Sequence, residues 1–323
     1  MTAATTPTFV ELWSSAVAHR GAEPFLIFEG PTGDVADWTY DEFDRVVART
    51  ASALARRGVV PGSSVHLALT NSPTFIAVWI ATLRLGGCIV PSDPMGRTPE
   101  LAEHIDRTSP AVGVCSASRA DTYLPAAGDR PVIQIDEADT EFDWLPTVGG
   151  DELPGTLHHE VTATDRAAVM FTSGTTGRPK GVEITQANYA FAGTTMAAAA
   201  DLGADDRHLV VLPLFHANAQ YYSFASAIAV GASVALMHTF SASGFVPQAA
   251  RHRVTHASLF AGPIRMILAR GGPPDPADGE LRLRHCWFAQ NLGDDQYDTF
   301  AGWIGCRPRQ LYGMTETIPA VLT

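Results

Sequence analysis

A glycine- and hydroxyl-rich segment is the part of this 323-residue sequence best suited to chemistry. It runs from Thr172 to Gly181, reads TSGTTGRPKG, and directly follows an apolar run that predicts a strand. Its glycines allow consecutive backbone N–H groups to approach an anion closely. The hydroxyls of Ser173, Thr175 and Thr176 and the ammonium group of Lys180, the only lysine in the sequence, add further donors. The segment therefore predicts a loop that binds a polyphosphate.

The spacing of this loop differs from that of a Walker A motif. Five residues separate Gly174 from Lys180, Pro179 stands where the second glycine would be, and Gly181 replaces the metal-binding Ser or Thr. A solvated surface loop is the alternative interpretation. The string closely resembles the phosphate-loop signature of the adenylate-forming superfamily, which includes acyl-CoA synthetases, luciferases and peptide-synthetase adenylation domains.

Other segments resemble the same superfamily in the expected order. They are residues 38–43 (WTYDEF), 83–91 (LRLGGCIVP), 212–216 (LPLFH) and 312–317 (YGMTET). The first two are interpreted as scaffold. Within the superfamily, Gln220, Asn291 and residues 315–318 resemble the crotonobetaine/carnitine-CoA ligase branch. We do not transfer the carnitine substrate on that basis.

The resemblance implies an acid–thiol ligase that forms AMP and uses ATP, Mg²⁺ and, as co-substrate, coenzyme A. A carboxylate attacks the α-phosphate of ATP, pyrophosphate leaves, and a thiol then takes the acyl group from the adenylate. Because the carboxylate is already an anion, positioning and stabilisation of phosphate charge carry the catalysis. The small-molecule acid itself is not identified by the sequence.

Site roles follow from the resemblance, position by position. Phosphate contacts fall on Thr172, Ser173, Gly174, Thr175, Thr176, Gly177 and Lys180. Further nucleotide contacts fall on Gln290, Asn291, Tyr312, Gly313 and Met314, with Gln290 or Asn291 at the adenine and Tyr312 stacked on it. Thr315 would contact the α-phosphate, and Glu316 would bind Mg²⁺, a hard ion that prefers oxygen ligands.

His216 is the resemblance's candidate for a catalytic group beside the reacting carboxylate. Amino-acid-activating relatives usually carry Asp at that position, so histidine favours an acid without an α-ammonium group. The expected acyl pocket comprises His216, Tyr221, Phe260, Ala261, Gly262, Ala289 and Gly313. A core position is the alternative for the aromatic members of this set.

These residues require a scaffold of alternating strands and helices. Apolar runs predict strands at 65–69, 88–90, 111–115, 132–135, 167–171, 209–212, 233–237, 257–260 and 284–288. Helices are expected after the capping box Thr39–Glu42, after Ser72-Pro73, and over 186–200, 218–230, 243–252, 262–270 and 294–304. The pattern predicts an α/β protein with two doubly wound subdomains, residues 1–165 and 166–323, joined by an acidic loop over 136–166.

Charge and composition exclude several classes. The sequence has 34 acidic and 22 basic residues, a net charge of −12, and no basic run, which argues against a nucleic-acid partner. The longest apolar stretch, residues 75–91, is interrupted by Arg84 and glycines, so no membrane span is expected. Four scattered cysteines and an N-terminus without a signal peptide favour the cytoplasm. The oligomeric state is not indicated.

The chain stops soon after the YGMTET segment, whereas full-length relatives continue into a C-terminal lid with a catalytic lysine. We therefore expect a large N-terminal domain without its lid, poorly active by itself. Two alternatives stay open at this point. One is a diazo-forming ligase that activates nitrite and passes it to an aryl amine. The other is a non-catalytic nucleotide-binding protein.

Overall fold

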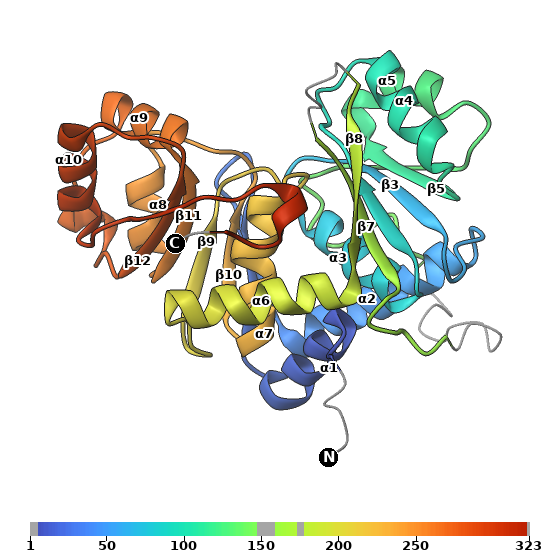
Figure 1. Ribbon diagram of the computed structural model, residues 1–323, viewed down its shortest axis with the longest axis horizontal. Helices are drawn as coiled ribbons and strands as arrows, with labels where there is room; N and C mark the ends of the chain where they lie inside the picture. The colour runs from blue at the N-terminus through green and yellow to red at the C-terminus, as the bar shows by residue number, and fades with distance from the viewer. Residues whose placement is uncertain (1–5, 147–158, 173–177, 322–323) are drawn as a thin grey trace. The chain divides into compact units, whose positions relative to one another are not determined.

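The computed structural model describes residues 6–146, 159–172 and 178–321 and has an α/β fold, as predicted (Figure 1). The chain forms two compact units. Unit 1 contains residues 1–23, 38–190 and 214–216, and unit 2 contains residues 24–37, 191–213 and 217–323. The chain passes between the units several times, so neither unit is one continuous stretch. The expected boundary at residue 165 falls between two strands of one sheet.

Unit 1 is built on a six-stranded sheet in the order β6-β5-β3-β4-β7-β8. Neighbouring strands are parallel except for the antiparallel pair β7 and β8. The strands are β3 (Ser64–Ala68), β4 (Cys88–Pro91), β5 (Val112–Ser116), β6 (Val132–Ile135), β7 (Arg166–Thr172) and β8 (Lys180–Thr185). Only β8 was not predicted. It is an edge strand in which only Ile184 is buried, so it has no apolar run.

The helices that lie wholly in unit 1 are α1 (Phe9–Arg20), α2 (Tyr40–Ala55), α3 (Pro73–Arg84), α4 (Thr98–Thr108) and α5 (Ala120–Ala127), and α1 packs on α2 and α3. The predicted capping box of α2 is confirmed, because the Glu42 N–H donates to Thr39 Oγ1 (3.2 Å) and the Thr39 N–H to Glu42 Oε2 (2.8 Å). Helices α4 and α5 pack on β3 and β5 through a buried cluster: Ala68, Leu101, Ile105, Cys115, Tyr123, Ala126 and Ala127. The sequence pattern did not predict α1, α4 or α5.

Unit 2 is built on a seven-stranded sheet in the order β13-β12-β11-β9-β10-β1-β2. Pairing is parallel from β13 through to β1. The strands are β1 (Pro24–Glu29), β2 (Val35–Thr39), β9 (Arg207–Val210), β10 (Ser233–Met237), β11 (His256–Phe260), β12 (His285–Ala289) and β13 (Arg309–Leu311). The prediction was correct for β9 to β12. It missed β1, β2 and the three-residue β13.

The helices predicted for the second half of the chain are confirmed. They are α6 (Gln186–Ala200), a π-helical segment (Asn218–Phe224) continuous with α7 (Ala225–Val230), α8 (Phe245–Arg251), α9 (Ala261–Arg270) and α10 (Asp294–Ile304). Side chains of α8, α9 and α10 share one apolar core with β9 to β12. None of the described helices is both long and apolar enough to cross a membrane.

A buried carboxylate holds β1 in the sheet of unit 2. Glu29 accepts hydrogen bonds from Gln248 Nε2 (2.9 Å) and Arg251 Nη1 (3.1 Å) of α8, and its carboxylate lies 2.6 Å from His252 Nε2. Burial raises the pKa of Glu29, but the bonds to Gln248 and His252 outweigh burial and leave it below its ordinary value. The ionised carboxylate therefore ties the N-terminal strand to α8.

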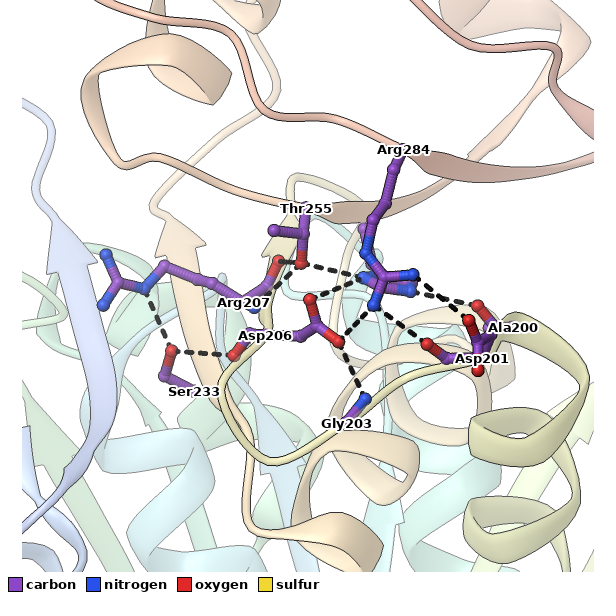
Figure 2. A network of polar contacts seen from close by, with 9 residues as sticks. Ala200, Asp201, Gly203, Asp206, Arg207, Ser233, Thr255 and Arg284 are labelled. Carbon is purple, nitrogen blue, oxygen red and sulfur yellow. Dashed lines mark hydrogen bonds and ion pairs between the residues drawn. The ribbon is translucent and has the colours of Figure 1, made fainter.

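A second polar network joins the amino ends of four strands of unit 2 (Figure 2). The carboxylate of Asp206, the residue just before β9, accepts hydrogen bonds from the Gly203 N–H (2.7 Å) and from Arg284 Nη2 (2.5 Å). Arg284 is the residue just before β12. The backbone carbonyl of Asp206 accepts a hydrogen bond from the Ser233 hydroxyl of β10. The hydroxyl of Thr255, the residue just before β11, accepts one from the Arg207 N–H. Ligands of parallel α/β sheets bind at the opposite, carboxyl ends. We therefore interpret this network as structural.

Asp206→Asn is expected to lower the free energy of unfolding by about 1–3 kcal/mol, because it removes a charge-assisted bond from a nearly buried group. Burial raises the pKa of Asp206, but the bonds from Gly203 and Arg284 lower it more, so the net shift is downward. The stabilisation is therefore present above the unfolded-state pKa and is lost as the pH falls through the folded-state value. Urea unfolding between pH 3 and 7 measures both effects.

Asp201→Asn is the matched control, because its fully exposed carboxylate lies 3.5 Å from the same Arg284. It is expected to change stability by less than about 0.5 kcal/mol. Equal losses for the two variants, or a loss for Asp206→Asn that grows below pH 4, would contradict the assignment.

Candidate functional site

The predicted phosphate loop is the connection of a β-hairpin in unit 1. Thr172 ends β7 and pairs directly with Lys180, the first residue of β8, and Phe171 pairs with Gly181. The expectation that the segment follows a strand is confirmed. Ser173, Gly174, Thr175, Thr176 and Gly177 lie outside the described residues. What the structure defines is the frame: two adjacent, paired strand ends that carry a hydroxyl and an ammonium group.

His216 also belongs to unit 1, at the end of the segment Leu214–His216. A buried amide fixes this segment, because Asn71 Oδ1 accepts from the Leu214 N–H (2.9 Å). The His216 ring lies 4.3 Å from the Phe215 ring and retains solvent exposure. Desolvation by the surrounding protein lowers its pKa, and the charge of Asp93 opposes that shift. The ring is therefore neutral at pH 7. The role of Asn71 in holding this segment was not predicted from the sequence. Its position shortly after the carboxyl end of β3 could have marked it as a candidate, because polar residues at such strand ends often contact a site.

Strand register brings most of the other candidates together within unit 2. Phe260 of β11 pairs with Ala289 of β12, which pairs with Leu311 of β13. The three strands are parallel, so their carboxyl ends lie in one row. Each is followed directly by a predicted site segment: Ala261-Gly262, Gln290-Asn291 and Tyr312–Glu316.

The backbone after β12 adopts an unusual conformation at that row. Gln290 has φ +72°, in the left-handed region that non-glycine residues seldom occupy. Its carbonyl accepts from Gln310 Nε2 (2.8 Å), and the Asn291 carbonyl accepts from Arg265 Nη2 (2.6 Å). Both carbonyls are therefore held, while both side chains are exposed and available to a ligand. Strained backbone of this kind is concentrated at binding sites.

The segment from Tyr312 onward is anchored to the π-helical segment. Tyr222 Oη donates to the Pro319 carbonyl (2.6 Å), and the Val321 N–H donates to the Tyr312 carbonyl (2.8 Å). Tyr312 is 59% exposed, which leaves its ring free to stack. The neighbouring Tyr221 is fully buried, and its pKa is raised by burial, by Tyr222 and by the charge of Glu316. Tyr221 and Glu316 are thus electrostatic neighbours.

The predicted residues accordingly fall into two sets. Unit 2 collects Tyr221, Phe260, Ala261, Gly262, Ala289, Gln290, Asn291 and Tyr312 to Glu316, and unit 1 holds Thr172, Lys180 and His216. Within the described ranges, no group of three or more His, Cys, Asp or Glu side chains is arranged to hold a metal ion. The four cysteines are free thiols, three of them buried.

Comparison with known families matches one model, that of AMP-binding enzymes, over residues 13–323. Among curated proteins, crotonobetaine/carnitine–CoA ligase of Escherichia coli O157:H7 is 32% identical over 321 residues, 97% of this chain and 62% of that protein. The corresponding ligase of Proteus mirabilis is also 32% identical, over 324 residues. The chain thus spans about three fifths of the length of the curated relatives it matches.

Among solved structures, a benzoate CoA ligase from Burkholderia xenovorans LB400 superposes with a TM-score of 0.82 at 19% identity. The match covers 96% of this chain and 61% of that one. At this identity the likeness establishes the fold alone.

Gly313→Ala tests how closely the segment after β13 is packed. A Cβ there would lie 3.0 Å from the Pro319 carbonyl oxygen, 3.1 Å from Ala320 Cα and 3.2 Å from Tyr222 Oη. Two of these neighbours are backbone, so the segment must shift, at an expected cost of about 1–3 kcal/mol in unfolding free energy. Thermal and urea unfolding measure this cost.

Gly262→Ala is the control, since a Cβ there meets nothing within 4 Å. Its stability is expected to stay the same or to rise by up to about 1 kcal/mol, because alanine is the better helix former. Equal destabilisation of the two variants would show that the packing around Gly313 is not the cause.

Proposed function

We propose, from the premise that this chain belongs to the AMP-binding enzyme family, that its protein activates a carboxylic acid as an acyl-adenylate and transfers the acyl group to coenzyme A. The observation that carries the proposal is the shared register of Phe260, Ala289 and Leu311. It places three segments from distant parts of the chain at one carboxyl edge, where α/β sheets bind their ligands.

In this proposal the hairpin between β7 and β8 binds the β- and γ-phosphates. The paired strand ends supply the Thr172 hydroxyl and the Lys180 ammonium group. Ser173, Gly174, Thr175, Thr176 and Gly177 would add hydroxyl and backbone N–H donors, as their types and order in the motif suggest. One ammonium group with several neutral donors can bind a polyphosphate without a cluster of cations.

The adenine would stack on the exposed ring of Tyr312, beside Gly313 and Met314. The edges of the base would meet Gln290 and Asn291, whose side chains are exposed beside a strained backbone. Stacking on an aromatic ring supplies about 1–3 kcal/mol per base and leaves base identity to the polar contacts.

Thr315 would donate to the α-phosphate, and Glu316 would bind Mg²⁺. The residues present fit this ion, because Mg²⁺ keeps most of its waters and uses one or two carboxylates together with substrate phosphates. The exposed carboxylate of Glu316 suits that mode, which needs no protein cage. When bound, the ion would neutralise charge on the phosphates.

The acid would bind with its carboxylate near His216 and its acyl part against Tyr221, Phe260, Ala261, Gly262, Ala289 and Gly313. One carboxylate oxygen forms a bond to the α-phosphorus as the bond to pyrophosphate breaks. The thiol sulfur then bonds to the acyl carbon, its proton is released, and AMP leaves. A neutral His216 can donate a hydrogen bond to the substrate without adding charge.

The named relatives act on different acids, by their names crotonobetaine or carnitine in one case and benzoate in the other. We therefore propose a substrate class and no single substrate: an acid without an α-ammonium group, since the chain has His216 and no aspartate at that position.

Glu316→Gln in the complete gene product is expected to lower ATP–pyrophosphate exchange at least about 100-fold, because metal stabilisation of phosphate charge is worth several kcal/mol. MgATP affinity should fall as well, measured by calorimetry without any acid present. Glu280→Gln, at an exposed glutamate of the same unit paired with Arg282, is the control and should match the parent. Undiminished exchange and MgATP affinity in Glu316→Gln would exclude the metal role.

A substrate panel tests the reaction class. AMP release is expected with a carboxylic acid plus coenzyme A and not with nitrite plus an aryl amine. AMP release with nitrite and an amine alone would replace the proposed ligase by a diazo-forming enzyme.

A further inference from the structure

Helix α4 contacts the residue that leads into the predicted phosphate loop. The His104 ring stacks on the Phe171 ring with centroids 3.9 Å apart and planes 3° from parallel. The Arg107 guanidinium carbon lies 4.8 Å from the centroid of the same ring, within cation–π range. Phe171 precedes Thr172, so two side chains of one helix turn fix the incoming strand at its last residues.

The same helix turn also contacts the residues that lead out of the loop. Arg107 Nη1 donates to the Pro179 carbonyl at 2.5 Å. Glu103 Oε1 lies 3.5 Å from Arg178 Nε and 3.7 Å from Arg107 Nη1. Arg107 therefore touches both flanks, Phe171 on one side and Pro179 on the other. Its reach across the hairpin adds to the strand pairing of Thr172 with Lys180.

A buried chain of hydrogen bonds sets the orientation of His104. Its Nδ1 lies 2.8 Å from Ser92 Oγ, which lies 2.9 Å from His66 Nε2, and His66 Nδ1 lies 2.7 Å from Tyr123 Oη. His66 is fully buried on β3. Burial lowers the pKa of His66 to about 3 and also lowers that of His104, where Arg107 adds to the effect and the charge of Glu103 opposes it. Both rings are neutral at pH 7, so their hydrogen bonds do not change there.

The contacts of α4 affect the positions of the predicted phosphate-binding groups. Phosphate-binding groups work only when they are held within a fraction of an ångström of the productive geometry, and a misplacement of 1 Å can cost about 100-fold in rate. Thr172 and Lys180 each lie next to a residue that α4 contacts. A shift of Phe171 or Pro179 therefore moves them.

We propose that Glu103, His104 and Arg107 of helix α4 are positioning residues for the phosphate-binding hairpin, acting through Phe171, Arg178 and Pro179. The inference rests on the proposed function, because it concerns the loop that would bind the phosphates of ATP. None of the three side chains needs to touch the nucleotide.

The test compares Arg107→Ala, Arg107→Lys and Arg130→Ala in the complete gene product. Arg130 is a matched control: it donates to the Ala127 carbonyl (3.2 Å) and pairs with Asp106 of α4 (3.5 Å), and neither contact involves the described residues of the hairpin. Arg107→Ala is expected to raise the KM for ATP about tenfold, the value of one charge-assisted hydrogen bond, and to leave the KM for the acid unchanged. Arg107→Lys should recover part of the loss, and Arg130→Ala should leave both constants unchanged.

Hydrogen exchange gives a readout that does not depend on nucleotide binding. The backbone amides of residues 178 and 180–182 are expected to exchange faster in Arg107→Ala than in the parent or in Arg130→Ala, Pro179 having no amide hydrogen. If Arg107→Ala does not fold, His104→Ala and His104→Phe serve instead. The phenylalanine variant keeps a ring to stack on Phe171 but loses the bond to Ser92, so its exchange and its KM for ATP should lie between those of the parent and those of the alanine variant.

Parent-like exchange and a parent-like KM for ATP in Arg107→Ala and His104→Ala would overturn the inference. The inference would also be overturned if Arg130→Ala changed amide exchange and the KM for ATP as much as Arg107→Ala does, since that result would indicate a general loss of stability. A parent protein that binds no MgATP would instead refute the proposed function, and the exchange data would still show whether α4 holds the hairpin.

Discussion

Parallel pairing with a fixed register is the constraint on which the candidate site of unit 2 depends. Because Phe260, Ala289 and Leu311 lie in one row, the residues that follow each strand lie at the same edge of the sheet. The network around Asp206 and Arg284 joins the opposite, amino ends of β9 to β12, and so includes two of these three strands (Figure 2). A register shift of one residue would turn every side chain of a strand to the other face of the sheet.

Sequence patterns identified most of the buried strands, and most of the strands that they missed are partly exposed or short; the largely buried β1 is an exception. Runs such as 233–237 and 285–289 are apolar because both faces of the sheet are covered, so they are visible without a structure. Strand β8 has one buried residue and β13 has three residues in all, so neither produces such a run. The proposed site residues come from the order of short motifs, and their roles stay predictions. The contacts of Asn71, His104 and Arg107 depend on tertiary packing, which no local pattern records.

The two kinds of site residue differ in what specifies them. Thr172, Lys180, Tyr312 and Glu316 are proposed from sequence motifs, in which the chemistry of the ligand restricts residue type and spacing. Arg107 acts on a backbone carbonyl and a phenyl ring, and both are common features of any fold. Its significance becomes visible only from its place beside the hairpin. Motif searches therefore tend to find the groups that touch a ligand and to miss the groups that hold them.

The position of β1 between β2 and β10 has a consequence for biosynthesis. Leu26 pairs with Val234, and Glu29 receives its partners from α8, so both must wait for about 200 further residues to be made. At about 5–20 residues per second, the apolar strand Pro24–Glu29 leaves the ribosome roughly 10–40 s before β10 exists. During that interval β1 can pair only with β2, so its other edge stays unpaired, and unpaired strand edges make a nascent chain prone to aggregation. Translation thus sets the time at which this edge is covered by β10.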